Sequence, residues 1–178
     1  MLFVPRFTPD NSNERMPGPP EPLEWPLYGR CVALIGPPGI GKSTLLRHLA
    51  AQAGPDAPLL LDDANPPAAA ALAAANPARR VFVTAAEFGF PGFREYQILP
   101  LDGAGIHHFL YAWHQQCPFP QPVADVESAI LIHPDLSELA GVPACLEQMS
   151  VAVSAGTLLE SGSDALCARV RQLLAGRP

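Results

Sequence analysis

Short hydrophobic runs, each bounded by Gly, Pro or polar residues, dominate the first half of the chain, and segments with helical character follow two of them. Runs of this length are typical of strands, and the continuous apolar ones are typical of strands that are buried on both faces. Strands that alternate with helices predict an α/β fold, in which a parallel sheet of about four strands carries flanking helices. The expected strands are Cys31–Ile35, Leu59–Leu61, Arg79–Thr84 and Tyr96–Leu99, and the expected helices are Thr44–Gln52 and Pro66–Ala75.

From Asp102 onward the pattern changes to helical periodicity. The first stretch has apolar residues at i, i+3, i+4 and i+7, which predicts an amphipathic helix: Ile106, Phe109, Leu110 and Trp113. Later stripes predict about four more helices, up to Leu174. Before the first strand, frequent prolines favour an extended, mobile leader. We therefore expect a leader at 1–26, an α/β domain at 27–101 and a small helical lid domain at 102–178.

The segment between the first strand and the first helix carries the clearest chemical signal. It fits the pattern G-x-x-x-x-G-K-[ST], in which glycines let the backbone wrap around an anion and the following helix adds the positive end of its dipole. Lys42, the only lysine of the chain, would reach the β- and γ-phosphates, and the Ser43 hydroxyl would bind Mg²⁺. The predicted nucleotide-binding loop of this P-loop NTPase pattern consists of Gly36, Pro37, Pro38, Gly39, Ile40, Gly41, Lys42, Ser43 and Thr44.

Two later strands end in polar residues that suit the same site. Leu59–Leu61 runs into Asp62, which would stand at the carboxyl edge of the sheet, where open α/β sheets bind their ligands. Asp62 is therefore a candidate Mg²⁺ ligand, although an aspartate at this position could instead only cap the next helix. Thr84 ends the next strand and is placed either to contact the γ-phosphate or simply to cap the strand.

Composition narrows the choice of partners. The net charge is −6, which argues against nucleic acid as a partner because binding to its phosphates needs clustered Lys and Arg. The four cysteines form no C-x-x-C pair, and the histidines lack the paired spacing of a zinc site. The chain has neither a signal-peptide pattern nor an apolar run long enough to cross a bilayer. We therefore expect a cytoplasmic protein without membrane contact.

In the order of these motifs the chain resembles the NACHT family of signal-transduction NTPases with numerous domains. The resemblance spans residues 30–175, where Leu101-Asp102 with Phe109 and Trp113, and then the segment from Glu138 to Leu146, follow the family's helical motifs. In that family the architecture is an ATP/ADP-dependent switch, with the nucleotide between the sheet domain and a helical lid. The resemblance implies ATP or ADP with Mg²⁺, and Pro143 near the adenine. It also implies protein partners or nucleotide-dependent self-association, in bacterial-type signalling or defence.

The chain departs from the family where hydrolysis would be carried out. Members usually have Asp-Gly-x-Asp-Glu after the magnesium strand, whereas this chain has Asp-Asp-Ala-Asn-Pro at 62–66, and Ala86 stands where an arginine is expected. Asp63 is the candidate general base, but its side chain is short. Gly54–Pro58 leaves no room for the strand that members have before the magnesium strand. We therefore predict a nucleotide-binding module with slow or no hydrolysis.

Two other functions stay open at this point. One is a working P-loop ATPase or small-molecule kinase, although a kinase usually has an arginine-bearing lid and the helical half has arginines only near its end, at Arg169, Arg171 and Arg177. The other is a degenerate scaffold that acts only through protein contacts.

Overall fold

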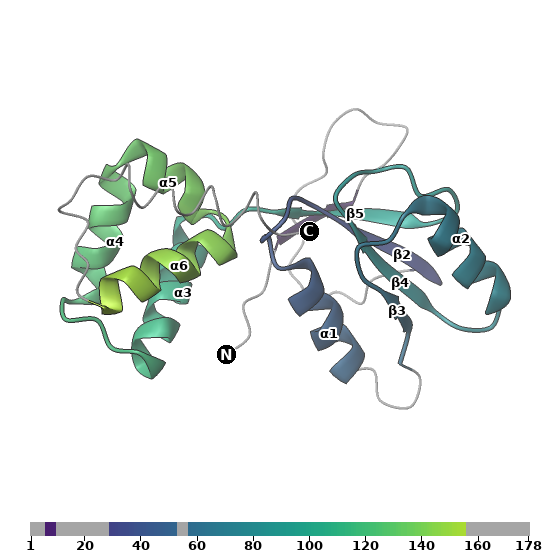
Figure 1. The fold of residues 1–178 in the computed structure, drawn as a ribbon, viewed down its shortest axis with the longest axis horizontal. Coiled ribbons are helices and arrows are strands. Elements are labelled where there is room, and N and C mark those ends of the chain that lie inside the picture. Colours follow the sequence, from purple (N-terminus) through teal and green to yellow (C-terminus); the bar gives the residue numbers. More distant parts are fainter. Residues whose placement is uncertain (1–5, 10–28, 53–56, 156–178) are drawn as a thin grey trace. The chain divides into compact units, whose positions relative to one another are not determined.

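The computed structural model describes residues 6–9, 29–52 and 57–155 of the 178-residue chain (Figure 1). These residues belong to two compact units, a sheet unit that ends at Leu99 and a helical unit that begins at Pro100. Most of the predicted leader and the predicted last helix lie outside the described residues.

The sheet unit is built on one sheet with the strand order β1-β5-β2-β4-β3. Its last four strands are mutually parallel, which confirms the predicted α/β class and the four-stranded parallel sheet. β1 pairs with β5 in the antiparallel direction and lies inside the predicted leader, where no strand was predicted. The strands are β1 (Arg6–Pro9), β2 (Cys31–Ile35), β3 (Leu59–Leu61), β4 (Val81–Ala85) and β5 (Arg94–Leu99).

Two helices, α1 (Lys42–Gln52) and α2 (Pro66–Ala75), cover opposite faces of the sheet. Successive side chains of a strand point to opposite faces, so a strand between two helices must be apolar at every position. In β2 the even-numbered residues pack with Leu45 and Leu46 of α1, and the odd-numbered residues pack with Ala69 and Ala73 of α2. This double burial explains the uninterrupted apolar run of β2.

A helix-free loop, residues 86–93, connects β4 to β5 on the other side of β2. Phe90 of this loop is buried in the core on the α2 face. The Glu95 carboxylate accepts hydrogen bonds of 2.7 Å from the backbone N–H groups of Gly89 and Phe90. Gly89 has φ +117°, which favours glycine. One buried aromatic ring and one carboxylate therefore hold this short crossover in place.

The helical unit contains four described helices around their own core. Asp102 caps the first of them by accepting a 2.9 Å hydrogen bond from the N–H of Gly105, and prolines occupy the first position of the last two, where no N–H is needed. The centre of the core of this unit consists of fully buried side chains, namely Leu110, Ile130, Leu136, Leu146 and Met149. The helices are α3 (Gly103–Gln116), α4 (Val123–Ile132), α5 (Pro134–Ala140) and α6 (Pro143–Ser154).

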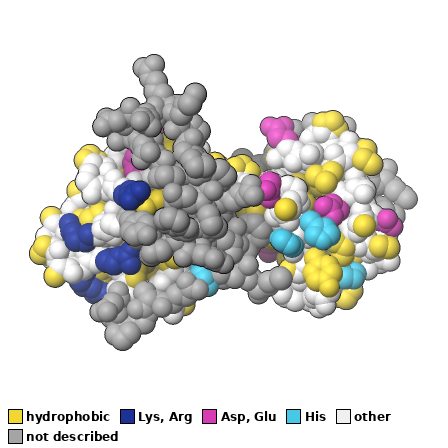
Figure 2. Space-filling view, turned by 180° about the vertical axis from the view of Figure 1, so that it is seen from behind, with side chains coloured by type: hydrophobic (Ala, Val, Ile, Leu, Met, Phe, Trp, Pro, Cys, Tyr) yellow, Lys and Arg dark blue, Asp and Glu magenta, His cyan; other side chains and the backbone are white. Residues whose placement is uncertain are grey.

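The described residues of the two units differ in charge. Residues 100–155 contain no Lys or Arg, and Figure 2 shows carboxylates and histidines on the helical unit but none of the dark-blue basic side chains.

Within the described ranges, every helix falls short of the length and apolar character that crossing a bilayer requires.

The two isoleucines of α4 test this packing. Ile130 is fully buried, whereas Ile132 on the same helix is 76% exposed. Ile130→Ala should lower the free energy of unfolding by about 2–5 kcal/mol because it removes buried methyl groups and leaves a cavity. Ile132→Ala should change it by roughly 0.5 kcal/mol or less. Urea unfolding followed by circular dichroism measures both, and equal losses would contradict the described core.

Candidate functional site

The loop that joins β2 to α1 owes its course to glycines and one buried isoleucine. Gly39 and Gly41 have φ values of +80° and +100°, a backbone region that strains other residues. The Ile40 side chain is buried in the core on the α1 face. Gly36 lies against it, and a Cβ at Gly36 would stand only 3.0 Å from Ile40 Cγ2. Ile40 thus anchors the loop to the core, while Pro37 and Pro38 at the tip of the loop are exposed to solvent.

Lys42, the first residue of α1, lies beneath this loop and is only 7% exposed. Its Nζ donates hydrogen bonds to the carbonyl oxygens of Gly36 (2.8 Å) and Pro37 (3.1 Å). These bonds use two of the three N–H donors of an ammonium group. Burial lowers the pKa of Lys42, and the nearby Asp63 and Asp62 carboxylates partly oppose that shift. The arrangement holds one cation against the inner side of a glycine-rich turn.

Asp62 joins three elements of the sheet unit through hydrogen bonds. Its Oδ1 accepts a 3.0 Å bond from the Ser43 hydroxyl of α1 and a further bond from the Thr84 hydroxyl of β4. Asp62 itself directly follows β3. Thr84 is fully buried, and its Oγ1 also accepts a 2.8 Å bond from the backbone N–H of Asp63. The threonine therefore fixes both aspartates at the carboxyl edge of the sheet.

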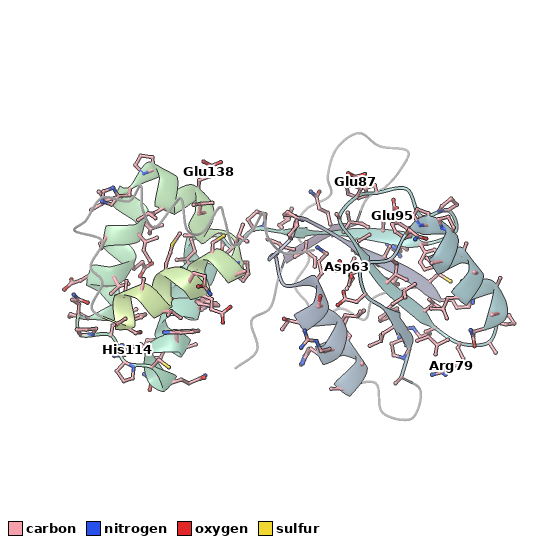
Figure 3. The ribbon with its side chains drawn as sticks, viewed as in Figure 1. Asp63, Arg79, Glu87, Glu95, His114 and Glu138 are labelled. Carbon is pink, nitrogen blue, oxygen red and sulfur yellow. The ribbon has the colours of Figure 1, made fainter. Side chains whose placement is uncertain are left out.

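Asp63 makes the turn that lets these bonds form. Its φ is +49°, in the left-handed region that most side chains avoid and that Asp tolerates better than most. The turn directs its N–H to Thr84, while its side chain is exposed. Figure 3 shows Asp63 just beyond β3, at the end of the sheet where α1 begins.

The surroundings of Asp62 favour its ionised form. Partial loss of solvation is the largest single influence and would raise the pKa of this exposed residue. Hydrogen bonds from the Thr84 and Ser43 hydroxyls and from the Asp63 backbone, with the positive charge of Arg47, outweigh this loss and lower the pKa below its ordinary value. Asp62 therefore carries its negative charge at neutral pH.

Ser43 and Asp62 fit one edge of a magnesium coordination sphere. Octahedral Mg²⁺ with oxygen ligands at about 2.0–2.1 Å places neighbouring ligand oxygens about 2.9 Å apart. The Ser43 and Asp62 oxygens are 3.0 Å apart, and the carboxylate is ionised. The described residues include no group of three or more His, Cys, Asp or Glu placed to hold a metal. Mg²⁺ usually needs only one or two protein oxygens, together with phosphate oxygens and water.

The structure brings most of the predicted site residues together. Lys42, Ser43, Asp62, Asp63 and Thr84 meet at the carboxyl edge of the sheet, next to the glycine-rich loop.

Two residues that were predicted to belong to the site, Thr44 and Pro143, are not part of this cluster. Thr44 is exposed in the first turn of α1. Pro143 begins α6 in the helical unit, and its predicted place near an adenine stays a prediction.

Sequence reasoning missed Arg47. This exposed arginine follows Ser43 by one helical turn, and its charge lowers the pKa of Asp62. Its effect on Asp62 depends on how α1 and β3 lie in space, so no sequence signal pointed to it.

Comparison with models of known protein families finds no match, and a search of curated protein sequences likewise finds none.

Thr84→Val tests the bonding of Asp62. It removes the hydroxyl that donates to Asp62, so the pKa of the Asp62 carboxyl should rise towards its ordinary value. The stabilisation given by ionised Asp62 is lost as the pH falls through its folded-state pKa, so that loss should begin at a higher pH in the variant. Carboxyl-carbon NMR titration measures the shift.

Thr44→Val is the matched control, because it makes the same chemical change at an exposed threonine nearby. An Asp62 pKa that moves as much in this control as in Thr84→Val would contradict the described bond.

Proposed function

We propose that the chain is a NACHT-like switch module that binds ATP or ADP with Mg²⁺ and hydrolyses ATP slowly or not at all. One observation carries the proposal. The only lysine of the chain is buried beneath a glycine-rich turn at the start of a helix, next to a serine and an ionised aspartate.

The residues have the chemistry that a nucleoside di- or triphosphate needs. The start of α1 offers backbone N–H groups and the positive end of the helix dipole to an anion. Lys42 would exchange its carbonyl partners Gly36 and Pro37 for phosphate oxygens, which are stronger acceptors because they are charged. Ser43 and Asp62 would hold Mg²⁺, which neutralises phosphate charge when bound. Thr84 keeps the Asp62 carboxylate in position.

The surroundings of Asp63 support the proposal of slow hydrolysis. A general base must come within about 2.6–3.2 Å of the water it activates, and Asp63 is a short side chain at an exposed turn. The residues just beyond it serve α2 instead. Asn65 caps that helix by accepting a 2.9 Å bond from the N–H of Ala68, and Pro66 begins it. The family's later acidic pair therefore has no counterpart here.

A phosphoryl-transfer function has less support. Kinases usually stabilise the transferred group with arginine or lysine from a lid, and the helical half has arginines only near its end, at Arg169, Arg171 and Arg177, which lie outside the described residues. A part in signalling or defence, as an assembly switch with protein partners, rests on the order of motifs in the sequence.

Lys42→Ala tests nucleotide binding. Removing a charged donor from a phosphate costs about 1.5–3 kcal/mol, so affinity for ADP and ATP should fall roughly tenfold to a hundredfold. Isothermal titration calorimetry in the presence of Mg²⁺ measures the loss. Arg80→Ala is the matched control, since it removes an exposed cation before β4 without touching the loop. A wild-type chain that binds neither nucleotide would refute the proposal.

Phosphate release by the wild type tests the predicted weakness of hydrolysis. Turnover of saturating Mg·ATP should be far below the 1–100 s⁻¹ that is typical of kinases, about 10⁻² s⁻¹ or slower. Asp63→Asn should then change this rate little. Steady multiple turnover that Asp63→Asn abolishes would show a working ATPase, and transfer of phosphate to a metabolite would show a kinase.

A further inference from the structure

The strand β3 has a neighbour on one side only. The strand order β1-β5-β2-β4-β3 places it at the end of the sheet, where it pairs with β4. On its outer side no strand lies among the described residues, whereas β1 covers the corresponding side of β5. We call the outer side of Leu59–Leu61 the β3 edge. An edge strand presents backbone N–H and C=O groups that can pair with a further strand.

Backbone geometry identifies the groups that the β3 edge offers. The Leu59 N–H donates a 2.8 Å hydrogen bond to the carbonyl oxygen of Arg80, the residue before β4. Along a parallel strand, residues that bond to one neighbour alternate with residues whose N–H and C=O point the other way. Leu60 therefore turns its N–H and C=O to the outside. These groups match the extended backbone of another strand, which offers a donor and an acceptor in return.

The side chains of β3 are apolar, and the middle one is partly uncovered. Leu59 and Leu61 pack against the core on the α2 face. Leu60 points to the opposite face, because side chains alternate along a strand, and it is 37% exposed. Every residue of the neighbouring β4, in contrast, is buried. The β3 edge therefore combines an exposed leucine with outward-facing backbone groups, which is the combination that favours pairing with another strand.

The two ends of the β3 edge differ in charge. Arg79 lies at the amino end, where its Nη2 donates a 2.9 Å hydrogen bond to the carbonyl oxygen of Ala57, just before β3. The exposed Asp62 and Asp63 follow β3 at the carboxyl end, and Figure 3 shows Asp63 and Arg79 at opposite ends of the sheet. A carbonyl oxygen orients a guanidinium group but leaves its positive charge in place. A carboxylate on an added strand is therefore favoured at the Arg79 end and repelled at the Asp63 end.

We propose that the β3 edge binds an extended segment of another protein by strand addition. The segment pairs its backbone with Leu60, places an apolar side chain beside that leucine and directs a carboxylate to Arg79. In this mode the backbone bonds supply affinity, and side chains at alternate positions supply specificity. A helix is excluded as the partner, because its own backbone bonds use its N–H and C=O groups.

A second copy of the chain suits the β3 edge less well than such a segment. The copy offers only its own three-residue β3, which the left-handed turn at Asp63 ends. Because Asp62 directly follows β3, the bound segment ends beside the candidate site. The proposal does not depend on nucleotide binding.

Two capped synthetic peptides, Glu-Val-Thr-Val-Thr-Val and Val-Thr-Val-Thr-Val-Glu, are the probes. They test both strand directions, since each brings its glutamate to the Arg79 end in one direction only. Amide hydrogen exchange, followed by NMR on the whole chain at saturating peptide, measures the pairing. At least one peptide should slow exchange of the Leu60 N–H about tenfold or more. The Leu59 N–H is the internal control, because it is already bonded to Arg80 and should change little.

Substitutions at Leu60 separate the backbone from the side chain. Leu60→Pro removes the outward N–H and leaves the Leu59 N–H to β4, so peptide affinity should fall about tenfold or more. Leu60→Ala is the matched control, which keeps the N–H and C=O and should lose less than about fivefold. Circular dichroism checks that both variants fold. Methylation of the peptide's backbone N–H groups tests the same bonds with the protein unchanged, and it should abolish the protection of Leu60.

Two further comparisons complete the test. Replacing the peptide glutamate by glutamine should weaken binding to the wild type and leave binding to Arg79→Gln unchanged, because Arg79 is the cation that the glutamate meets. Lys42→Ala should bind the peptide like the wild type, which separates this test from that of the proposed function.

Four results would overturn the proposal. The first two are a Leu60 N–H that neither peptide protects, and a folded Leu60→Pro variant that binds like the wild type. The third is a Leu60 N–H that is protected without peptide in dilute solution, which would mean that the chain covers its own edge. The fourth is protection without peptide that appears as the protein concentration rises, which would identify a second copy as the partner.

Discussion

The hydrogen bonds to one oxygen of Asp62 are the interaction on which the candidate site depends. Hydroxyl groups from α1 and β4 meet this oxygen, which belongs to the residue after β3. This shared acceptor is what links the Ser43 hydroxyl to the Thr84 hydroxyl. The bonds also keep the carboxylate ionised, because they outweigh its partial loss of solvation. An ionised carboxylate oxygen is the type of protein ligand that Mg²⁺ takes when phosphate oxygens and water complete its coordination.

The strand order makes this meeting possible. β4 lies between β2 and β3, so the buried Thr84 at its carboxyl end stands between the glycine-rich loop and Asp62. In β2 and β4 every residue is buried, so a shift by one residue would exchange the side chains that pack on the α1 face with those that pack on the α2 face. The same order brings the amino ends of three strands together, and exposed arginines lie at these ends. One topology thus places the candidate site and the exposed arginines at opposite ends of the strands.

Much of the fold could be predicted from the sequence, and the reasons are local. The apolar run of β2 and the helical period of α3 each reflect burial that a single segment must satisfy. β1 was not predicted, because its pairing depends on β5, about ninety residues later in the chain, and prolines argued against a strand there. The loop, Asp62 and Thr84 could be proposed as a site from their places at strand ends. The bond between Asp62 and Thr84, the left-handed turn at Asp63 and the charge effect of Arg47 depend on three-dimensional neighbours, so no local pattern predicts them.

The central claim is that this chain holds a nucleotide, and the most direct measurement is to identify which nucleotide the purified chain carries and binds. Mass spectrometry of the denatured protein's supernatant, together with equilibrium dialysis against labelled ATP and ADP with Mg²⁺, should find one adenine nucleotide per chain. Most of an ATP sample should stay uncleaved through the dialysis. A protein that emerges empty and takes up neither nucleotide would contradict the account, whatever the geometry around Asp62.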